Sequence, residues 1–301
     1  MLRVLSILLA GTHLMSAGTE IRVLVVGDSW AEFMWNNRTL RNVFVAHGVT
    51  DVVEQGAVTA ISGSTAVEWA TPSYLQLITD ELTAYPTVDT VLLSMGGNDF
   101  LAGQPGGGWY VGMPPSELDL LLNTTIDAIQ TVIDHILNLR PSAEIILNLY
   151  DYTNFVESLT GPLFILCNGT WQDLGQPTPI QINQAQIDME QFLVGALVDG
   201  ISVFHVSHYG AMQFHFGYPS MSILPGTLPP PGDLMLPSPP QAMFLGYDCF
   251  HLNPEGYQVM GENLWQAYFE ARYTCVSVNS LFTNWPVTTM TELVDTLNLC
   301  P

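Results

Sequence analysis

Arg22-Val-Leu-Val-Val-Gly-Asp-Ser29 joins a buried strand to a sharp turn. The apolar, β-branched run Arg22–Val26 is typical of a strand covered on both faces. It ends at Gly27-Asp28-Ser29, and a helical stretch follows. Ser29 is therefore expected where a strand turns into a helix, a position that offers free backbone N–H groups and a partial positive charge.

The same alternation of strand and helix continues along the chain. Four further strands are predicted at Val52–Val58, Thr90–Ser94, Ala143–Leu149 and Ile201–Val206. Helices are predicted at Pro72–Ala84, Ser116–Leu139, Gln181–Val198 and from Pro254, capped by Asn253, to about Ala271. This pattern predicts an α/β fold with a mostly parallel five-stranded sheet and helices on both faces. In such sheets ligands bind beyond the carboxyl ends of the strands.

The amino-acid composition excludes several classes of function. The 301 residues include no lysine, six arginines and 28 acidic residues, for a net charge of −22, and 48% are hydrophobic. The hydrophobic content is ample for a core, and the negative charge disfavours nucleic-acid binding and anionic membrane surfaces. Without lysine there can be no P-loop, pyridoxal or Ser-x-x-Lys chemistry. Dinucleotide, zinc-protease and Cys-x-x-Cys motifs are missing too, so we expect neither a cofactor nor a metal.

The N-terminus indicates export. Residues 1–20 combine Met1-Leu2-Arg3, a short apolar run Val4–Ala10 and Ser16-Ala17-Gly18, which is typical of a signal peptide. We therefore expect a secreted or periplasmic protein, the alternative being an ordinary N-terminal extension. No other run is apolar for long enough to span a bilayer, so stable membrane insertion of the mature chain is not expected.

Four cysteines, Cys167, Cys249, Cys275 and Cys300, allow three pairings between which the sequence does not decide. Cys275 and Cys300 both follow the last helix, which favours a bridge within the tail at residues 273–301. The spacing matches no zinc site. Two segments, 151–179 and 208–247, interrupt the strand–helix rhythm and are predicted to be irregular insertions. No linker divides residues 21–272, which we take as one domain.

Three motifs supply the groups that stabilise an oxyanion. Ser29 lies at a helix start, and Gly63, in Ile61-Ser62-Gly63-Ser64, can bring its backbone N–H close to a ligand. Asn98, in Gly96-Gly97-Asn98-Asp99, carries a neutral side-chain donor on a loop after a strand. Asp99 is expected to fix that loop by local hydrogen bonds rather than to react.

A base and its carboxylate come from the end of the domain. Asp248 precedes His251 by three residues, just before the capped helix. This spacing lets the carboxylate reach one ring nitrogen, which leaves the other to accept a proton from a serine. The other histidines lack a carboxylate at that spacing.

With these motifs the chain resembles the SGNH hydrolases, also called the GDSL esterase/lipase family. Their name comes from four blocks, represented here by Ser29, Gly63, Asn98 and His251, with Asp248 completing Asp-x-x-His. The resemblance spans residues 21–272 and implies a flavodoxin-like three-layer α/β/α sandwich. The Gly-x-Ser-x-Gly elbow of α/β-hydrolases is missing.

The resemblance also implies a mechanism. Ser29 would attack an ester carbonyl while His251 accepts its proton, and water would then hydrolyse the acyl-enzyme. The oxyanion would be held by the N–H groups of Ser29 and Gly63 and by the Asn98 side chain. Two residues depart from the commonest pattern: Trp30 follows the nucleophile, and Cys249 lies inside the Asp-x-x-His block, where a disulfide could shape the loop.

Substrate contacts are predicted from the 208–247 insertion. Its apolar side chains could line an acyl groove for short- to medium-chain esters or lipids, and the expected contacts are Trp30, Met212, Phe214, Phe216 and Phe244. Equally, these side chains could bury one another under a long loop. The alternative function is a carbohydrate O-deacetylase, with sugar contacts from Trp69, Trp109 and Trp171. A non-catalytic binding module is the third possibility.

Overall fold

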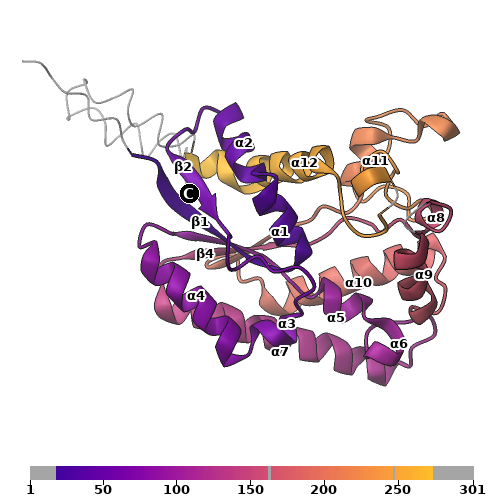
Figure 1. The fold of residues 1–301 in the computed structure, drawn as a ribbon, viewed down its shortest axis with the longest axis horizontal. Helices are drawn as coiled ribbons and strands as arrows, with labels where there is room; N and C mark the ends of the chain where they lie inside the picture. Colours follow the sequence, from indigo (N-terminus) through magenta and orange to yellow (C-terminus); the bar gives the residue numbers. More distant parts are fainter. Residues whose placement is uncertain (1–17, 162–163, 247, 274–301) are drawn as a thin grey trace, which may run out of the picture.

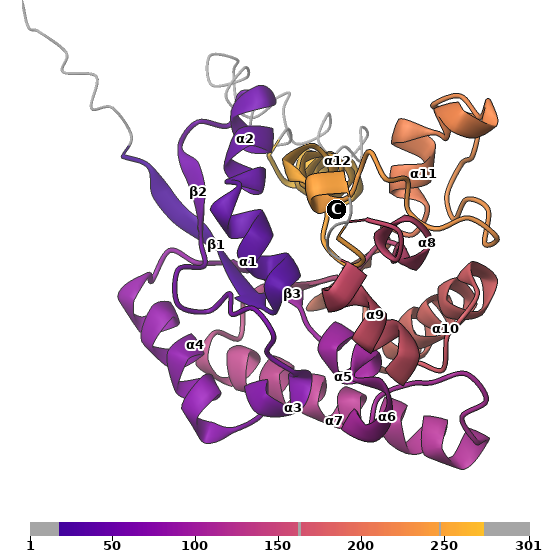
Figure 2. The same ribbon diagram turned by 45° about the vertical axis from the view of Figure 1, so that its right-hand side comes forward.

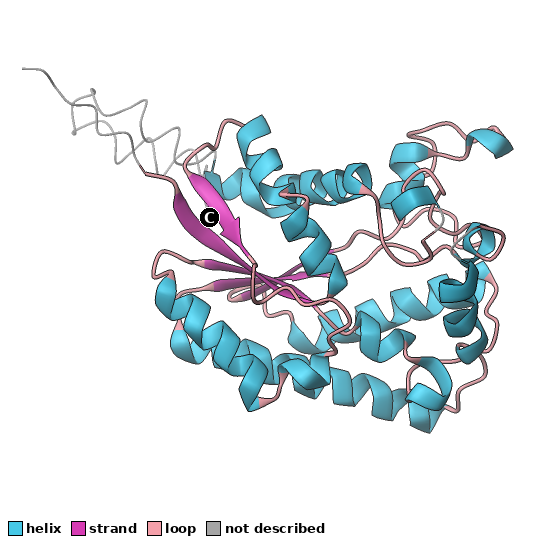
Figure 3. Cartoon of the chain, viewed as in Figure 1, coloured by secondary structure: helices cyan, strands magenta, loops and turns pink. Residues whose placement is uncertain are grey.

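The fold is that of a computed structural model, which describes residues 18–161, 164–246 and 248–273. A five-stranded parallel sheet in the order β2-β1-β3-β4-β5 forms its centre (Figures 1 and 3). The strands are β1 Glu20–Gly27, β2 Val52–Gln55, β3 Thr90–Ser94, β4 Glu144–Asn148 and β5 Val203–Val206.

Helices cover both faces of the sheet, as both Figure 1 and Figure 2 show. One face carries α1 Ser29–Asn36, α2 Thr39–Ala46 and α12 Pro254–Leu264, which continues into a π-helical turn at Trp265–Phe269. The other face carries α3 Ala66–Trp69, α4 Pro72–Ala84, α7 Pro115–Leu139 and α10 Pro179–Leu197. The expected three-layer α/β/α sandwich is therefore confirmed, and the sheet is parallel throughout the described strands.

Shorter elements gather beyond the carboxyl ends of the strands, toward the right of Figure 1. They are α5 Gly97–Leu101, α6 Gly103–Gly106, α8 Phe155–Ser158, α9 Phe164–Asp173 and α11 Ala211–Phe216, with 3-10 turns at Pro219–Met221 and Phe244–Gly246. Within the described part of the chain, no helix has the length and apolarity that a membrane span requires.

The ends of β1 and β3 are locked together at the point where the first motif begins. Gly27 pairs with Ser94 in register, and the backbone N–H of Asp28 donates to the Ser94 carbonyl at 2.9 Å. Gly27 has φ +141°, and a Cβ there would lie 1.7 Å from the Ser94 oxygen. Only glycine fits this close approach, so the turn that presents Ser29 depends on it.

Most predicted elements match the structure closely, and two do not. The expected second strand Val52–Val58 is too long, because β2 ends at Gln55, where Gly56 packs tightly against Val25 and Trp35. The segment 151–179 is not irregular throughout, since it contains α8 and α9. Asn154 caps α8 by accepting a hydrogen bond from the Glu157 N–H at 3.1 Å.

The described part of the 208–247 insertion, residues 208–246, is mostly loop and is held by buried polar side chains. Asp151, just beyond β4, accepts hydrogen bonds from the backbone of Gly210 and Met212, both at 2.8 Å. Gln213 donates to the carbonyls of Asp233 and Leu236 at 3.0 and 2.8 Å. These contacts satisfy backbone groups that a long loop would otherwise leave unpaired.

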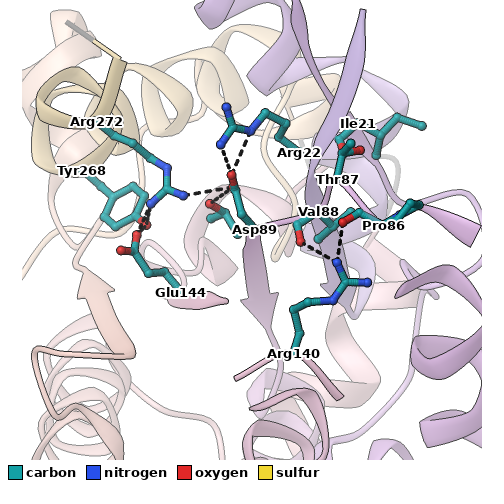
Figure 4. Close-up of polar contacts among 11 residues, drawn as sticks. Ile21, Arg22, Pro86, Thr87, Val88, Asp89, Arg140, Glu144, Tyr268 and Arg272 are labelled. Atoms are coloured by element: carbon teal, nitrogen blue, oxygen red, sulfur yellow. Dashed lines mark hydrogen bonds and ion pairs between the residues drawn. The ribbon is translucent and has the colours of Figure 1, made fainter. Parts of the chain in front are cut away.

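An ion-pair network fastens the amino ends of the strands (Figure 4). Asp89 binds Arg22 of β1 through Nε at 2.8 Å and Arg272 through Nη2 at 3.0 Å. Arg272 also pairs with Glu144, the first residue of β4. Arg140 donates to backbone carbonyls at the end of α4 and in the turn that follows. The network ties the last helix to the sheet at the edge opposite the carboxyl ends.

Candidate active site

Ser29 is the first residue of α1, directly beyond β1. Asp28 caps the helix, its carboxylate accepting a hydrogen bond from the Trp30 N–H at 2.9 Å. The sequence folds this way because a buried apolar strand, a glycine turn and an Asp cap follow one another without a gap. The Ser29 hydroxyl is thereby held at the positive end of a helix.

The structure brings Ser29, His251 and Asp248 together. His251 Nε2 lies 2.8 Å from Ser29 Oγ, although the two residues are 222 positions apart. On the other side of the ring, His251 Nδ1 lies 3.1 Å from Asp248 Oδ2. Because the carboxylate accepts a hydrogen bond from Nδ1–H, Nε2 is left unprotonated as the acceptor for the serine hydroxyl.

The Asp248 carboxylate is fixed by its own loop. Its second oxygen, Oδ1, accepts hydrogen bonds from the backbone N–H groups of Phe250 at 2.7 Å and His251 at 2.8 Å. Burial acts to raise the pKa of this carboxyl, but the hydrogen bond and charge of the His251 ring, with the two backbone donors, hold the pKa below its usual range. Asp248 is therefore charged when it faces the histidine.

The back of the histidine ring is covered by Phe33, a residue that the sequence analysis missed. The Phe33 and His251 rings stack with centroids 4.9 Å apart and an interplanar angle of 13°. Phe33 also stacks on Tyr257 of α12, at 5.8 Å. One signal for it exists in the sequence, because Phe33 follows Ser29 by four residues and so lies on the same face of α1.

Possible oxyanion donors border the same pocket as Ser29. Gly63 and Asn98 both line it, and no described residue accepts a hydrogen bond from the backbone N–H of Ser29 or Gly63. Asn98 Nδ2 donates one hydrogen bond to the Ser64 carbonyl at 2.9 Å, which orients the amide. Asp99 accepts from the Ala66 N–H at 2.7 Å, so it joins the Asn98 loop to the start of α3 rather than forming the local hydrogen bonds that were expected.

The pocket has a volume of about 270 Å³. Its described lining contains Ser29, Trp30, Gly63, Asn98 and His251, and a wall of apolar side chains formed by Phe100, Leu101, Ala102, Met189 and Phe250. Trp30 is thus placed beside the nucleophile as expected, with its ring edge-on to Tyr150 at 5.3 Å.

The other expected substrate contacts lie elsewhere. Met212 is fully buried against α12, Phe214 is 41% exposed, and Phe216 packs against the core. Phe244 contacts the edge of Phe33 at 5.5 Å, behind the histidine. Of the described residues 208–246, Tyr209 alone lines the pocket. The expected acyl contacts from this insertion therefore do not line this pocket: Met212 and Phe216 pack inward, whereas other apolar side chains of the insertion are exposed (Phe214, Met221, Leu224 and Met235).

The tryptophans considered for sugar contacts do not line this pocket either. Trp69 is completely buried, and its indole N–H donates to Ser64 Oγ at 2.8 Å. Trp109 stacks on Phe100 at 5.4 Å, and the Trp171 indole donates to the Pro177 carbonyl at 3.2 Å. All three rings serve packing or local structure.

A chain of buried hydrogen bonds holds the Gly27-Asp28-Ser29 turn in place. The Tyr150 hydroxyl donates to Asp28 Oδ2 at 2.6 Å and accepts from the Gly97 N–H at 2.8 Å. It therefore links the turn after β1 to the Asn98 loop. Burial raises the pKa of the Asp28 carboxyl to about 6, although its hydrogen bonds from Tyr150 and Trp30 favour the charged form.

This raised pKa predicts a pH dependence of stability. In the folded protein Asp28 keeps its proton up to about pH 6, whereas the unfolded chain loses it near pH 3.8. Unfolding between these values releases a proton, so stability falls as the pH rises through the window. Relative to Asp28→Asn, which does not titrate, the wild-type free energy of unfolding should fall by about 3 kcal/mol between pH 3 and pH 7. Urea titrations at several pH values measure this, and parallel profiles would contradict it.

A disulfide ties the histidine loop to the 151–179 insertion. Cys249, between Asp248 and His251, is bonded to Cys167 of α9, with a Cα–Cα distance of 5.9 Å. The Asn154 N–H also donates to the Cys249 carbonyl at 2.9 Å. The bridge does shape the base loop, which was one of the open possibilities. The favoured pairing of Cys275 with Cys300 lies outside the described residues.

Removing this crosslink should weaken the fold. The bridged cysteines are 82 positions apart, and closing a loop of that length restricts the unfolded chain. We expect Cys167→Ser/Cys249→Ser to lower the free energy of unfolding by on the order of 4 kcal/mol under non-reducing conditions. Guanidinium titrations of the variant and wild type measure the difference. A change below about 1 kcal/mol would show that the bridge adds little.

A comparison with protein families agrees with this geometry. The family model described as GDSL-like Lipase/Acylhydrolase matches residues 23–264, most of the chain. The chain belongs to this family. As a GDSL-like acylhydrolase it is a carboxylic ester hydrolase, and small-molecule esters are its substrates. The matched range runs from β1 into α12 and contains every residue discussed at the site.

Comparison with solved structures found several similar chains, of which the first described here, with a TM-score above 0.5, shares the fold. The periplasmic domain of a lipopolysaccharide acetyltransferase from Salmonella ser. Paratyphi A has a TM-score of 0.51 and 14% identity, covering 84% of this chain and 85% of that one. The lipase Lip_vut3 from a goat rumen metagenome has a TM-score of 0.46 and 13% identity, over 83% and 98% of the two chains. A carbohydrate esterase family 3 protein from Talaromyces cellulolyticus has a TM-score of 0.42 and 10% identity, covering 84% of this chain and 97% of that one. Comparison with curated protein sequences gave no match.

Proposed function

We propose that Ser29 is the nucleophile of this ester hydrolase, with His251 as its base and Asp248 as the group that orients the base. The 2.8 Å contact between Ser29 Oγ and His251 Nε2 carries this proposal. The hydroxyl attacks the ester carbonyl as its proton passes to Nε2, which then protonates the leaving alcohol. Water, activated by the same nitrogen, hydrolyses the acyl-enzyme and regenerates Ser29.

The oxyanion that forms during attack is assigned to the N–H groups of Ser29 and Gly63 and to the Asn98 amide. Each of the three groups lies on the segment that follows a strand, and the two N–H groups have no acceptor among the described residues. Donors placed in advance stabilise the developing charge without reorganisation.

Removing one of these donors tests the assignment. We expect Asn98→Ala to lower kcat about 100- to 1,000-fold with little change in KM, because the amide acts on the transition state rather than on the bound ester. Steady-state kinetics on a p-nitrophenyl ester measure it. Asn123→Ala is the matched control, since Asn123 is exposed on α7 and its amide donates to the Asp119 carbonyl. Equal activity of the two variants would remove Asn98 from the oxyanion site.

For the substrate we propose short- to medium-chain acyl esters. The small pocket and its apolar wall, with Phe100, Met189 and Phe250, support this range. The alternative is a carbohydrate O-deacetylase of the same family. A binding module without catalysis is disfavoured, because all five groups needed for acyl transfer are present.

One experiment separates these three functions. Purified protein is given p-nitrophenyl esters of increasing acyl length beside acetylated xylan, and a fluorophosphonate probe reports on Ser29. A maximum at short to medium chains, with labelling that is lost in Ser29→Ala, is the expected result. Activity on acetylated xylan alone would favour the deacetylase, and a folded protein that neither labels nor turns over would be a binding module.

We also propose a secreted or periplasmic location, with residues 1–20 as the signal peptide. A disulfide beside the reactive histidine supports an oxidising compartment. The net charge of −22 supports a protein that does not bind nucleic acids.

A further inference from the structure

The Tyr150 hydroxyl joins two of the segments that carry the assigned oxyanion donors. Tyr150 lies two residues beyond the end of β4, and its side chain is buried. The hydroxyl donates to Asp28 Oδ2 at 2.6 Å and accepts from the Gly97 N–H at 2.8 Å. Asp28 directly precedes Ser29, and Gly97 directly precedes Asn98. One phenol oxygen therefore lies between the turn that presents the nucleophile and the loop that presents the amide.

The turn that presents Ser29 has further supports besides Tyr150. The Asp28 N–H donates to the Ser94 carbonyl at 2.9 Å, which fixes the turn to the end of β3. The Asp28 carboxylate also accepts from the Trp30 N–H at 2.9 Å, which fixes the turn to the start of α1. These two hydrogen bonds do not involve the phenol, so the turn can keep its shape when the phenol oxygen is removed.

The loop that presents Asn98 depends on Tyr150 for its position on this side. Gly97 is the first residue of α5, where a backbone N–H has no acceptor within the helix. The Tyr150 hydroxyl is its acceptor. The Asn98 amide is held from the other direction, by the Ser64 carbonyl at 2.9 Å. Among the described side chains, that of Tyr150 alone hydrogen-bonds both to this loop and to the turn before α1.

The Tyr150 hydroxyl cannot serve as an oxyanion donor itself. Burial and the negative charge of Asp28 raise the pKa of Tyr150 well above its usual range, so the hydroxyl stays protonated. A phenol has one proton to donate, and this one is directed at Asp28. Any effect of Tyr150 on the reaction therefore passes through the groups that it holds. Displacing such groups by about 1 Å can lower a rate about 100-fold.

We propose that Tyr150 is a positioning residue, whose hydroxyl holds the Asn98 loop at the distance from the Ser29 turn that lets both donors reach one oxyanion. This proposal rests on the proposed function of Ser29 and Asn98. Oxyanion donors act on the transition state only if they are in place before the charge develops. The contribution of Tyr150 should therefore appear in kcat and not in KM.

Tyr150→Phe removes the oxygen and keeps the ring, which packs edge-on against Trp30 at 5.3 Å. We expect kcat on a p-nitrophenyl ester to fall about 10-fold, with KM nearly unchanged. The rate is expressed per site labelled by the fluorophosphonate at completion, so that unfolded molecules are not counted. Tyr152→Phe is the matched control and should keep the wild-type kcat. Tyr152 is fully buried, does not line the pocket, and donates to the Pro231 carbonyl at 2.8 Å.

A double-mutant cycle with Asn98→Ala shows whether Tyr150 acts through the amide. In the Asn98→Ala background, Tyr150→Phe should lower kcat by less than about 3-fold, because the donor that it positions is already missing. A residue that only supports the fold would lower kcat by the same factor in both backgrounds. If Tyr150→Phe does not fold, Gly97→Ala tests the same contact, since its Cβ would lie 2.6 Å from Tyr150 Cζ and displace the ring. The same coupling to Asn98→Ala is expected.

The outcomes separate this proposal from the proposed function. If the wild type hydrolyses esters and Ser29 is labelled, but Tyr150→Phe keeps the wild-type kcat, the positioning role is wrong and the nucleophile assignment stands. An equal loss in both backgrounds, or a loss confined to KM, overturns the positioning role as well. If no ester is hydrolysed and Ser29 is not labelled, the proposed function fails and this proposal falls with it.

Discussion

Ser29→Ala is expected to lower kcat for ester hydrolysis by a factor on the order of 10⁶. The variant removes the oxygen that lies 2.8 Å from His251 Nε2, and no described hydroxyl other than that of Ser29 is hydrogen-bonded to this nitrogen. The remaining rate would come from water attacking an ester held by the oxyanion donors. Steady-state kinetics on the best p-nitrophenyl ester give the size of the loss.

The matched control for this variant is Ser73→Ala. Ser73 is exposed in the first turn of α4, so it shares the chemistry of the substitution but not the pocket. Circular dichroism and thermal unfolding should show both variants folded. If Ser29→Ala retained more than about a tenth of the wild-type kcat, Ser29 could not be the nucleophile.

The second large effect is expected for Asp248→Asn, with kcat lowered about 10⁴-fold. The asparagine oxygen can keep the two hydrogen bonds from the backbone N–H groups of Phe250 and His251, so the loop should retain its shape. The amide nitrogen then faces His251 Nδ1, which must become the acceptor. The proton moves to Nε2, and the ring can no longer take the proton of Ser29.

Kinetics of Asp248→Asn beside Asp134→Asn measure this effect. Asp134 is exposed on α7 and accepts a hydrogen bond from Gln130, so its substitution changes charge without touching the site. Labelling by the fluorophosphonate should slow in parallel with kcat, because both depend on the basicity of Nε2. If Asp248→Asn kept the kcat and the labelling rate of the wild type, a group other than Asp248 would have to orient His251.

The framework of the fold could be predicted because its signals are local. Thr90–Ser94 and Pro72–Ala84 match the structure residue for residue, one as an apolar run and the other as a helix with proline at its start. The approach of Ser29 to His251 could also be predicted, although it is not local. The motifs of Ser29, Gly63 and Asn98 follow predicted strands, whose ends converge on one edge of the sheet. His251 does not follow a strand, and its approach to Ser29 was implied by the resemblance to the SGNH hydrolases.

The lining of the pocket could not be predicted in the same way. Met212 and Phe216 are apolar, and apolar side chains can either line an acyl groove or pack into the core. The sequence does not distinguish these two roles, and the structure shows that both side chains pack inward. Gln186 lines the pocket from α10, a helix that was predicted from the sequence without any site residue on it. The partner of Cys249 likewise depended on where α9 lies, and that segment was expected to be irregular.

The bridge between Cys167 and Cys249 has a consequence for limited proteolysis. The loop between them includes exposed side chains such as Leu224 and Met235, at 67% and 68% exposure, where a protease can cut. One cut there places Ser29 on one fragment and His251 on another, yet the sulfur bond keeps them a single covalent molecule. The nicked protein would migrate as one band until a reductant is added, and only then could the two fragments separate.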